Sequence, residues 1–181
     1  MQIRLDGKVA IVTGGSKGIG LGIARAFVEA GAQVMITSRK AEACAAAVAE
    51  LGEGAHFEAG HVGREEDAER VVEATLERLG RIDVLVNNAA TNPYAGPTID
   101  VDRPRWDKTF ETNLTAPMFW TQRVWRRFMK EHGGAVVNIS SVGGLRTNPI
   151  LGVYDVTKAA MIHLTKQLAA ELAPRVRVNC L

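Results

Sequence analysis

The sequence has few cysteines, almost no excess of charge and no long hydrophobic run. Its two cysteines, Cys44 and Cys180, lie far apart in apolar surroundings, so we expect reduced core residues and neither a disulfide nor a metal site. A net charge of +2 gives no argument for a nucleic-acid or anionic-membrane partner. No run approaches the length of a membrane span, and the N-terminus lacks the pattern of a signal peptide. We therefore expect a cytoplasmic protein.

Two kinds of segment alternate along the 181 residues. Short β-branched runs predict buried strands over residues 8–13, 32–38, 54–60, 82–88, 134–140 and 176–181. Helical spacing of apolar residues predicts helices over residues 18–30, 41–51, 65–79, 113–131 and 154–173. This alternation implies right-handed βαβ units. The expected fold is α/β, a doubly wound parallel sheet with helices on both faces, in a single domain over residues 1–181.

The first strand runs into a glycine-rich turn, Val9–Gly20, "VAIVTGGSKGIG", in which glycine fills four of the last seven positions. Ligands of open parallel sheets bind beyond the carboxyl ends of the strands. Glycine lets a phosphate lie against bare backbone, and the following helix presents free N–H groups to it. The turn therefore predicts a bound pyrophosphate; the alternative is a tight turn without a ligand.

Two other motifs compete for this turn. A Walker P-loop needs Lys-Ser/Thr after the last glycine, and here Leu21 follows Gly20, so that reading fails. Gly14–Gly18 also matches the G-x-S-x-G nucleophile elbow, which would make Ser16 the nucleophile of a serine hydrolase. No earlier strand precedes the turn to supply an oxyanion loop, so the hydrolase is the weakest of the alternatives.

Tyr154 and Lys158 stand four residues apart on a predicted helix and therefore share a face. A phenol is a poor base at neutral pH, and a nearby cation favours its ionised form. The pair is thus a candidate for acid–base chemistry, although an ordinary exposed pair is the alternative. Ser141 follows a predicted strand and falls at the same sheet edge as the glycine turn.

The order of several motifs resembles the short-chain dehydrogenase/reductase family, in its branch of 3-oxoacyl-carrier-protein reductase-like and carbonyl reductase-like members. The motifs are Thr13-Gly14-x3-Gly18-x-Gly20, "NNAA" at 87–90, "TNL" with Asn113, "NISS" ending at Ser141, Tyr154-x3-Lys158 and "VRVNCL". The resemblance covers essentially the whole chain. It implies a Rossmann fold and an enzyme that transfers a hydride between a nicotinamide cofactor and a ketone or secondary alcohol.

The resemblance also implies the site residues. Tyr154 exchanges a proton with the substrate oxygen, Ser141 hydrogen-bonds that oxygen, Lys158 supports Tyr154 and binds the nicotinamide ribose, and Asn113 continues a proton relay. The expected catalytic residues are therefore Asn113, Ser141, Tyr154 and Lys158. The expected cofactor-binding residues are Gly14, Ser16, Lys17, Gly18, Ile19, Gly20, Ser38, Arg39, His61, Val62, Asn88, Ala89, Tyr154 and Lys158, with no metal ligands.

The residues after the second strand bear on cofactor choice. Members of the family that use NAD carry an acidic residue there for the ribose hydroxyls. This chain has Ser38 and Arg39 instead, and Lys17 in the glycine turn adds a second cation. Two cations without a carboxylate suit a 2′-phosphate, so we expect NADP(H) to be preferred, with NAD(H) possible. Solvated surface charges are the alternative.

The chain departs from the family pattern in three places. His61-Val62 stands where the family has Asp-Val near the adenine, and Ala90 replaces the glycine of Asn-Asn-Ala-Gly. The sequence stops at "VNCL", so we expect a domain truncated at its C-terminus that lacks the family's lid and seventh strand. A dinucleotide-binding protein without turnover, acting as a sensor or assembly partner, is therefore the second hypothesis.

The expected partners are a small ketone or alcohol, which includes a carrier-bound acyl chain, and other copies of the chain. By resemblance, the helices over 113–131 and 154–173 pair across a two-fold axis, and a complete chain forms a homotetramer. Four aromatic residues on the first helix support an interface: Phe119, Trp120, Trp125 and Phe128. The alternative is that all four belong to the core.

Overall fold

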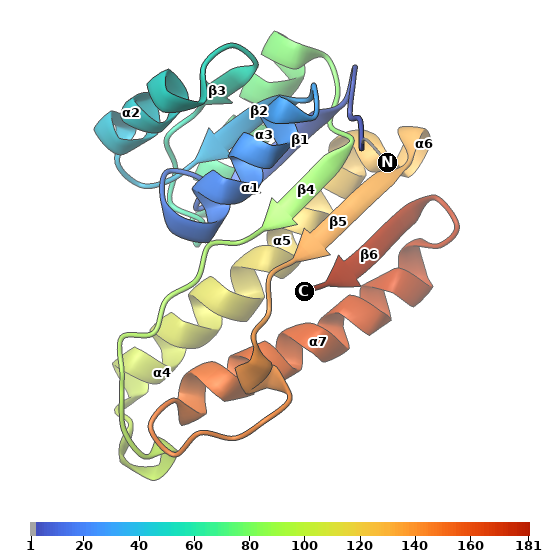
Figure 1. Ribbon diagram of the computed structural model, residues 1–181. Helices are drawn as coiled ribbons and strands as arrows, with labels where there is room; N and C mark the ends of the chain where they lie inside the picture. The colour runs from blue at the N-terminus through green and yellow to red at the C-terminus, as the bar shows by residue number, and fades with distance from the viewer. Residues whose placement is uncertain (1–2) are drawn as a thin grey trace.

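The computed structural model of the protein describes residues 3–181 and contains one parallel sheet. Its six strands lie in the order β3-β2-β1-β4-β5-β6, as Figure 1 shows. Their bounds are β1 Val9–Thr13, β2 Gln33–Thr37, β3 Ala55–Phe57, β4 Val84–Asn87, β5 Gly134–Asn138 and β6 Val176–Cys180. Every predicted strand is therefore present, each within the predicted range, and β1 lies at the centre, where the order of the strands reverses.

Helices cover both faces of the sheet, as the alternation predicts. The helices are α1 Gly18–Glu29, α2 Ala41–Leu51, α3 Glu65–Leu79, α4 Arg103–Phe110, α5 Ala116–Val124, α6 Lys130–His132 and α7 Gly152–Leu172. Side chains of a strand alternate between the faces, so Val12 packs with α1 and α2, whereas Ile11 packs with α3, α5 and α7. The doubly wound fold is confirmed. Among residues 3–181 no helix combines the length and hydrophobicity needed to cross a bilayer.

The helix expected over 113–131 starts earlier than predicted. It begins with α4 at Arg103, where the side chain of Asp102 caps the helix by accepting a hydrogen bond of 2.8 Å from the backbone N–H of Arg105. Two π-helical turns, Glu111–Thr115 and Trp125–Met129, join α4, α5 and α6 into one rod that ends at His132. The prediction missed α4 because its exposed, charged sequence has almost no apolar stripe.

The two cysteines occupy different environments. Cys44 lies buried on α2, whereas Cys180 is only half-buried at the end of β6. Both thiols are free. The expectation of core cysteines is confirmed for Cys44 and is wrong for Cys180, which shares the covered face of β6 with Val176 and Val178 but lies at the end of the strand, where the cover is incomplete.

A buried polar chain links β4, β5 and α7 beneath the carboxyl edge of the sheet. The amide of Asn87 donates to Asn138 Oδ1 at 2.9 Å and to Thr121 Oγ1 at 3.2 Å. Asn138 Nδ2 donates in turn to Thr165 Oγ1 on α7 at 2.9 Å. Buried polar groups that find partners fix a single packing arrangement. This chain sets the position of α7 against the strands whose ends carry the candidate site.

Candidate functional site

The glycine turn between β1 and α1 packs tightly on one side and is open on the other. Gly14 and Gly18 have positive φ angles of 66° and 56°. A Cβ atom on Gly20 would collide with the carbonyl oxygen of Gly14 and with the amide of Asn88, whereas one on Gly18 would meet nothing within 4 Å. The open side adjoins the N-terminus of α1, so the turn fits a phosphate group.

Thr13 and Asn88 hold this turn against the end of β4. The hydroxyl of Thr13 accepts hydrogen bonds from the backbone N–H groups of Asn88 and Ala89 at 3.0 and 3.1 Å. Asn88 Nδ2 donates to the carbonyl oxygens of Thr13 and Gly14 at 2.9 and 3.3 Å. The turn is thus built before any ligand arrives, which lowers the cost of binding.

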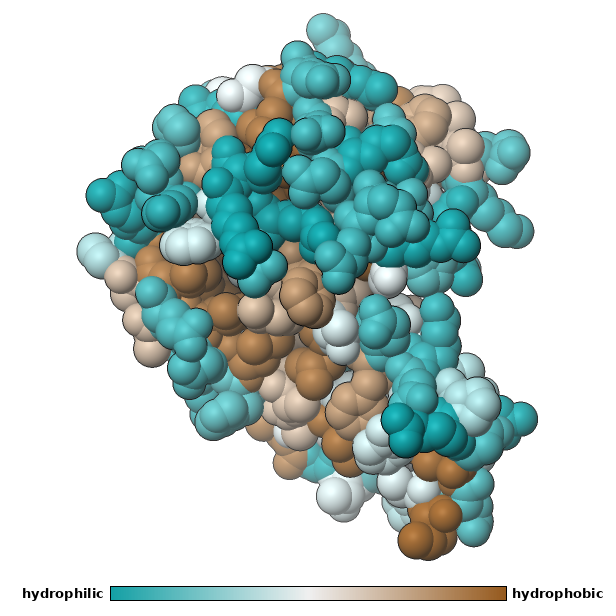
Figure 2. All heavy atoms as spheres, turned by 180° about the vertical axis from the view of Figure 1, so that it is seen from behind, coloured by the Kyte–Doolittle hydropathy of each residue, from teal (hydrophilic) through white to brown (hydrophobic). Residues whose placement is uncertain are grey.

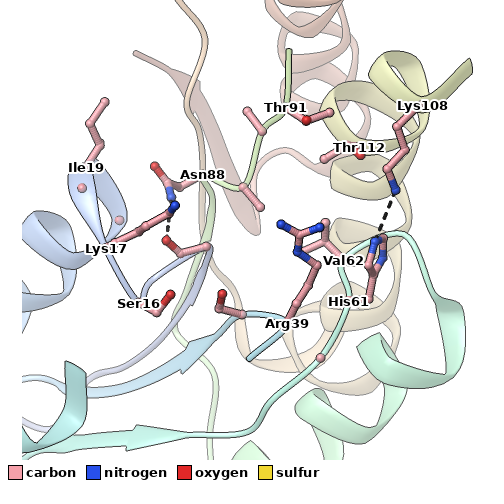
Figure 3. A pocket seen from close by; sticks show the side chains of 17 residues that line it. Ser16, Lys17, Ile19, Arg39, His61, Val62, Asn88, Thr91, Lys108 and Thr112 are labelled. Carbon is pink, nitrogen blue, oxygen red and sulfur yellow. Dashed lines mark hydrogen bonds between the residues drawn. The ribbon is translucent and has the colours of Figure 1, made fainter. Parts of the chain in front are cut away.

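A cavity of about 390 Å³ extends from the glycine turn along the carboxyl edge of the sheet, and Figure 3 shows the residues around it. The structure places these predicted cofactor residues on its wall: Gly14, Ser16, Lys17, Gly18, Ile19, Gly20, Ser38, Arg39, His61, Val62, Asn88 and Ala89. Gly60, Ala90, Thr91, Lys108 and Thr112 also line it and were not among them. Its size lies within the usual range of small-molecule sites.

Tyr154 and Lys158 do not line this cavity, so their expected contact with the cofactor stays a prediction. The structure does bring the two side chains together. The Lys158 ammonium nitrogen lies 5.4 Å from the centroid of the Tyr154 ring and donates a hydrogen bond of 2.7 Å to the carbonyl oxygen of Ile139, just beyond β5. Lys158 is 2% exposed, and burial lowers the pKa of its ammonium group.

Ser141 lies two residues beyond Ile139, before a short 3₁₀ turn, Val142–Gly144. Its Oγ accepts a hydrogen bond of 3.1 Å from the backbone N–H of Gly143, which leaves the hydroxyl hydrogen free to donate to a ligand. A second cavity, of about 590 Å³, lies between residues 143–149 and the start of α7. The hydrogen bonds of Ser141 to Gly143 and of Lys158 to Ile139 hold both side chains just past the carboxyl end of β5.

Asn113 lies on the π-helical turn between α4 and α5 and is buried. Its Oδ1 accepts a hydrogen bond of 2.8 Å from the backbone N–H of Thr91, and its Nδ2 donates to the carbonyl oxygen of Thr91 at 2.9 Å. Nδ2 also approaches Thr157 Oγ1 on α7 at 3.1 Å. One amide therefore ties the wall of the cofactor-sized cavity to the helix of Tyr154 and Lys158.

The parallel sheet, with a cavity at a glycine turn where the strand order reverses, defines an α/β protein of the Rossmann type. The sequence model of the family described as short chain dehydrogenase matches residues 8–181. The chain belongs to the short-chain dehydrogenase family.

Individual relatives agree with this assignment. Dehydrogenase/reductase SDR family member 4 of Sus scrofa is 46% identical over 98% of this chain and 65% of its own length. The mitochondrial dehydrogenase/reductase SDR family member 2 of Homo sapiens is 41% identical over 97% of this chain and 64% of its own. The chain thus spans less than two thirds of these relatives. The structure of a short-chain type dehydrogenase/reductase from Mycobacterium ulcerans matches with a TM-score of 0.92 and 34% identity, over 98% of this chain and 67% of that one.

Proposed function

We propose that this chain is the nucleotide-binding and catalytic part of an NADP(H)-preferring oxidoreductase that interconverts a ketone and a secondary alcohol. One observation carries the proposal. A glycine turn with an open side follows β1, and a buried lysine beside a tyrosine is bonded to Ile139 just beyond β5, at the same edge of one parallel sheet. The first feature suits a dinucleotide and the second suits proton transfer.

The residues divide the chemistry as follows. A nicotinamide, when bound in the cavity, would supply or accept the hydride. Tyr154 gives its hydroxyl proton to the developing alkoxide, or takes one from the alcohol, while the free hydrogen of Ser141 Oγ orients the same oxygen. Lys158 places a positive charge beside Tyr154, and its bond to Ile139 fixes the direction of the ammonium group. Asn113 holds the wall of the cavity in register with α7.

The charge of the cavity supports NADP(H). Ser38 and Arg39 follow β2 on the cavity wall, and no carboxylate is among the residues that line the cavity. Arginine pairs well with phosphate oxygens, whereas the ribose hydroxyls of NAD(H) prefer an acidic acceptor. The proposal therefore includes a lower affinity for NADH than for NADPH.

The test is a panel of ketones with the absorbance of NADPH as the readout, on the wild type and on Tyr154→Phe. The variant keeps the ring and loses the exchangeable proton, so turnover should fall by about 10²-fold or more while the affinity for NADPH stays within twofold. An equally active variant would overturn the mechanism. Nucleotide binding without turnover on any ketone would favour a sensor or assembly protein instead.

A serine hydrolase that uses Ser16 has no support in the geometry. Ser16 lines the nucleotide cavity, and within residues 3–181 its hydroxyl forms no hydrogen bond with a histidine or a carboxylate. A nucleophile of that class needs an adjacent base.

We also propose self-association through α5 and α7. Figure 2 shows apolar residues gathered on the middle and lower part of the molecule seen from behind. The prediction that Trp120 contributes to the interface is wrong. Its side chain is 1% exposed and donates its indole N–H to the carbonyl oxygen of Val62 at 3.0 Å. Phe119, at 36% exposed, and Val156 on α7, at 44%, remain available. Light scattering tests this, and a monodisperse monomer at high concentration would exclude the interface.

A further inference from the structure

The chain around Ser141 lies directly against α7. In Figure 1 it leaves β5, crosses α7 and then loops back to enter the same helix. Ser140 Oγ donates a hydrogen bond of 2.9 Å to the carbonyl oxygen of Lys158, and a Cβ atom on Gly144 would come within 2.9 Å of that same oxygen. The backbone next to Ser141 therefore takes its position from α7, so the side chains of α7 that touch it help to set where the Ser141 hydroxyl lies.

Asp155, in the first turn of α7, touches both ends of the segment 143–148. Its Oδ2 accepts a hydrogen bond of 3.0 Å from the backbone N–H of Asn148. Its Oδ1 lies against Gly143, where an added Cβ atom would collide with it and would lie 3.5 Å from Ser141 Oγ. Gly143 is the residue whose N–H donates to Ser141 Oγ. One carboxylate thus connects α7 to the hydrogen-bond partner of the Ser141 hydroxyl.

The fold itself gains little from a carboxylate at this position. Asp155 is 6% exposed, and among residues 3–181 its buried Oδ1 has no hydrogen-bond donor. A buried acceptor that loses water without gaining a donor lowers stability, which offsets the bond between Oδ2 and Asn148. The positive end of the α7 dipole offsets only part of the cost of burying the charge. A buried polar group of this kind calls for a role other than stability.

We propose that Asp155 is a positioning residue that acts on the reaction through Ser141. Its carboxylate holds Gly143 and Asn148 against α7 and so fixes the N–H group that occupies one lone pair of Ser141 Oγ. The hydroxyl hydrogen of Ser141 is then left to point towards the substrate oxygen with which Tyr154 exchanges its proton. This inference rests on the proposed function and adds to it a residue that acts without touching the reacting atoms.

A double-mutant cycle between Asp155 and Ser141 tests this, with kcat/KM for a ketone, followed by the absorbance of NADPH, as the readout. Ser141→Ala should lose about 10²-fold or more, because it removes a donor to the substrate oxygen. Asp155→Ala should lose about tenfold or more, because a misplaced donor stabilises the transition state less. In the Ser141→Ala background, Asp155→Ala should cost less than about twofold, since the group through which it acts is already gone. The affinity for NADPH should change by less than about twofold in all three variants.

Two further variants separate positioning from folding. Asp155→Asn keeps an oxygen that can accept the N–H of Asn148, so it should recover part of the loss in kcat/KM. A loss as large as that of Asp155→Ala would contradict the proposed contact. Asp102→Ala is the matched control, because that carboxylate also accepts one backbone N–H, that of Arg105, but at the start of α4. It should keep the kcat/KM of the wild type, and an equal loss there would overturn the inference.

Amide hydrogen exchange gives a readout that does not depend on turnover. The N–H group of Gly143 is bonded to Ser141 Oγ and not to Asp155, so its faster exchange in Asp155→Ala would support the inference. Unchanged exchange there, or a variant that does not fold, would overturn it. If the wild type reduces ketones and the two substitutions of the cycle act independently, only the role of Asp155 fails. A wild type without turnover, combined with faster exchange at Gly143 in the variant, would refute the proposed function and support the effect of Asp155 on Ser141.

Discussion

Replacing Lys158 by methionine separates the stability of the fold from the chemistry of the site. Lys158 is almost fully buried, and its ammonium group donates one hydrogen bond, to the carbonyl oxygen of Ile139 at 2.7 Å. Methionine is a long, flexible, uncharged side chain that adapts to the same space. Lys158→Met therefore removes the cation beside Tyr154 with little change in packing.

Two opposing effects set the change in the free energy of unfolding. A buried ammonium group carries a desolvation penalty of several kcal/mol, and Lys158→Met removes it. The substitution also leaves the carbonyl oxygen of Ile139 without its donor, which costs about 1–3 kcal/mol. We expect the two to cancel to within about 2 kcal/mol, which for a chain of this length is a shift in Tm of less than about 8 °C.

The pH dependence of this difference has a definite sign. Burial lowers the pKa of Lys158 in the folded state below the value of 10.5 that an exposed lysine has. Between those two values the unfolded state binds more protons than the folded state, so the stability of the wild type rises with pH. Lys158→Met lacks this contribution. The free energy of unfolding of the wild type should therefore rise relative to that of the variant as the pH is raised towards 10.5.

Urea unfolding followed by circular dichroism gives the stability, and ketone-dependent oxidation of NADPH gives the activity. Lys158→Met should be folded, and its turnover should be about 10²-fold or more below that of the wild type. Lys166→Met, on the exposed face of α7, should keep both the stability and the turnover of the wild type. Full activity in Lys158→Met would refute the proposed role of the cation. A loss of stability above about 4 kcal/mol would show that the lysine serves the fold.

Other substitutions test the cavity and the loop beyond β5. Arg39→Asp should shift preference towards NADH in steady-state kinetics, because it replaces a phosphate donor with an acceptor for ribose hydroxyls. Gly20→Ala should weaken nucleotide binding about tenfold or more and cost about 1–3 kcal/mol by overpacking, measured by calorimetry and melting. Gly22→Ala on the same helix meets open space and should stabilise by up to about 1 kcal/mol. In Gly143→Ala the new Cβ atom would collide with Asp155 Oδ1 and shift the N–H group that donates to Ser141 Oγ. Its kcat should therefore fall more than its nucleotide affinity.

The parts of the fold that the sequence predicts are those that local chemistry determines. The predicted bounds of α2 and α3 match the structure, because Gly52 and Gly80 end those helices with positive φ angles of 78° and 76°. The glycine turn, too, could be placed from its spacing, because positive φ angles at Gly14 and Gly18 are a local requirement for glycine.

The residues that sequence analysis missed depend on tertiary contacts. Lys108 comes within 3.3 Å of His61 only through the tertiary fold, and no spacing along the chain relates residues 61 and 108. The start of α4 was missed because its charged surface has almost no periodicity. Asp102 and the following Arg-Pro were a capping signal that was present in the sequence and could have located it.

Asn113 joins the wall of the cavity at the glycine turn to the helix that carries Tyr154 and Lys158, and its substitution should affect both. Asn113→Ala leaves the backbone N–H and carbonyl of Thr91 without partners and removes the contact with Thr157. At about 1 kcal/mol for each lost bond, the free energy of unfolding should fall by about 3 kcal/mol. Asn113→Asp keeps only the acceptor for the Thr91 N–H, so it should not restore activity. Because the Thr91 loop is freed from α7, we expect nucleotide affinity and kcat to fall together. Loss of stability with unchanged kcat would show that the amide supports only the fold.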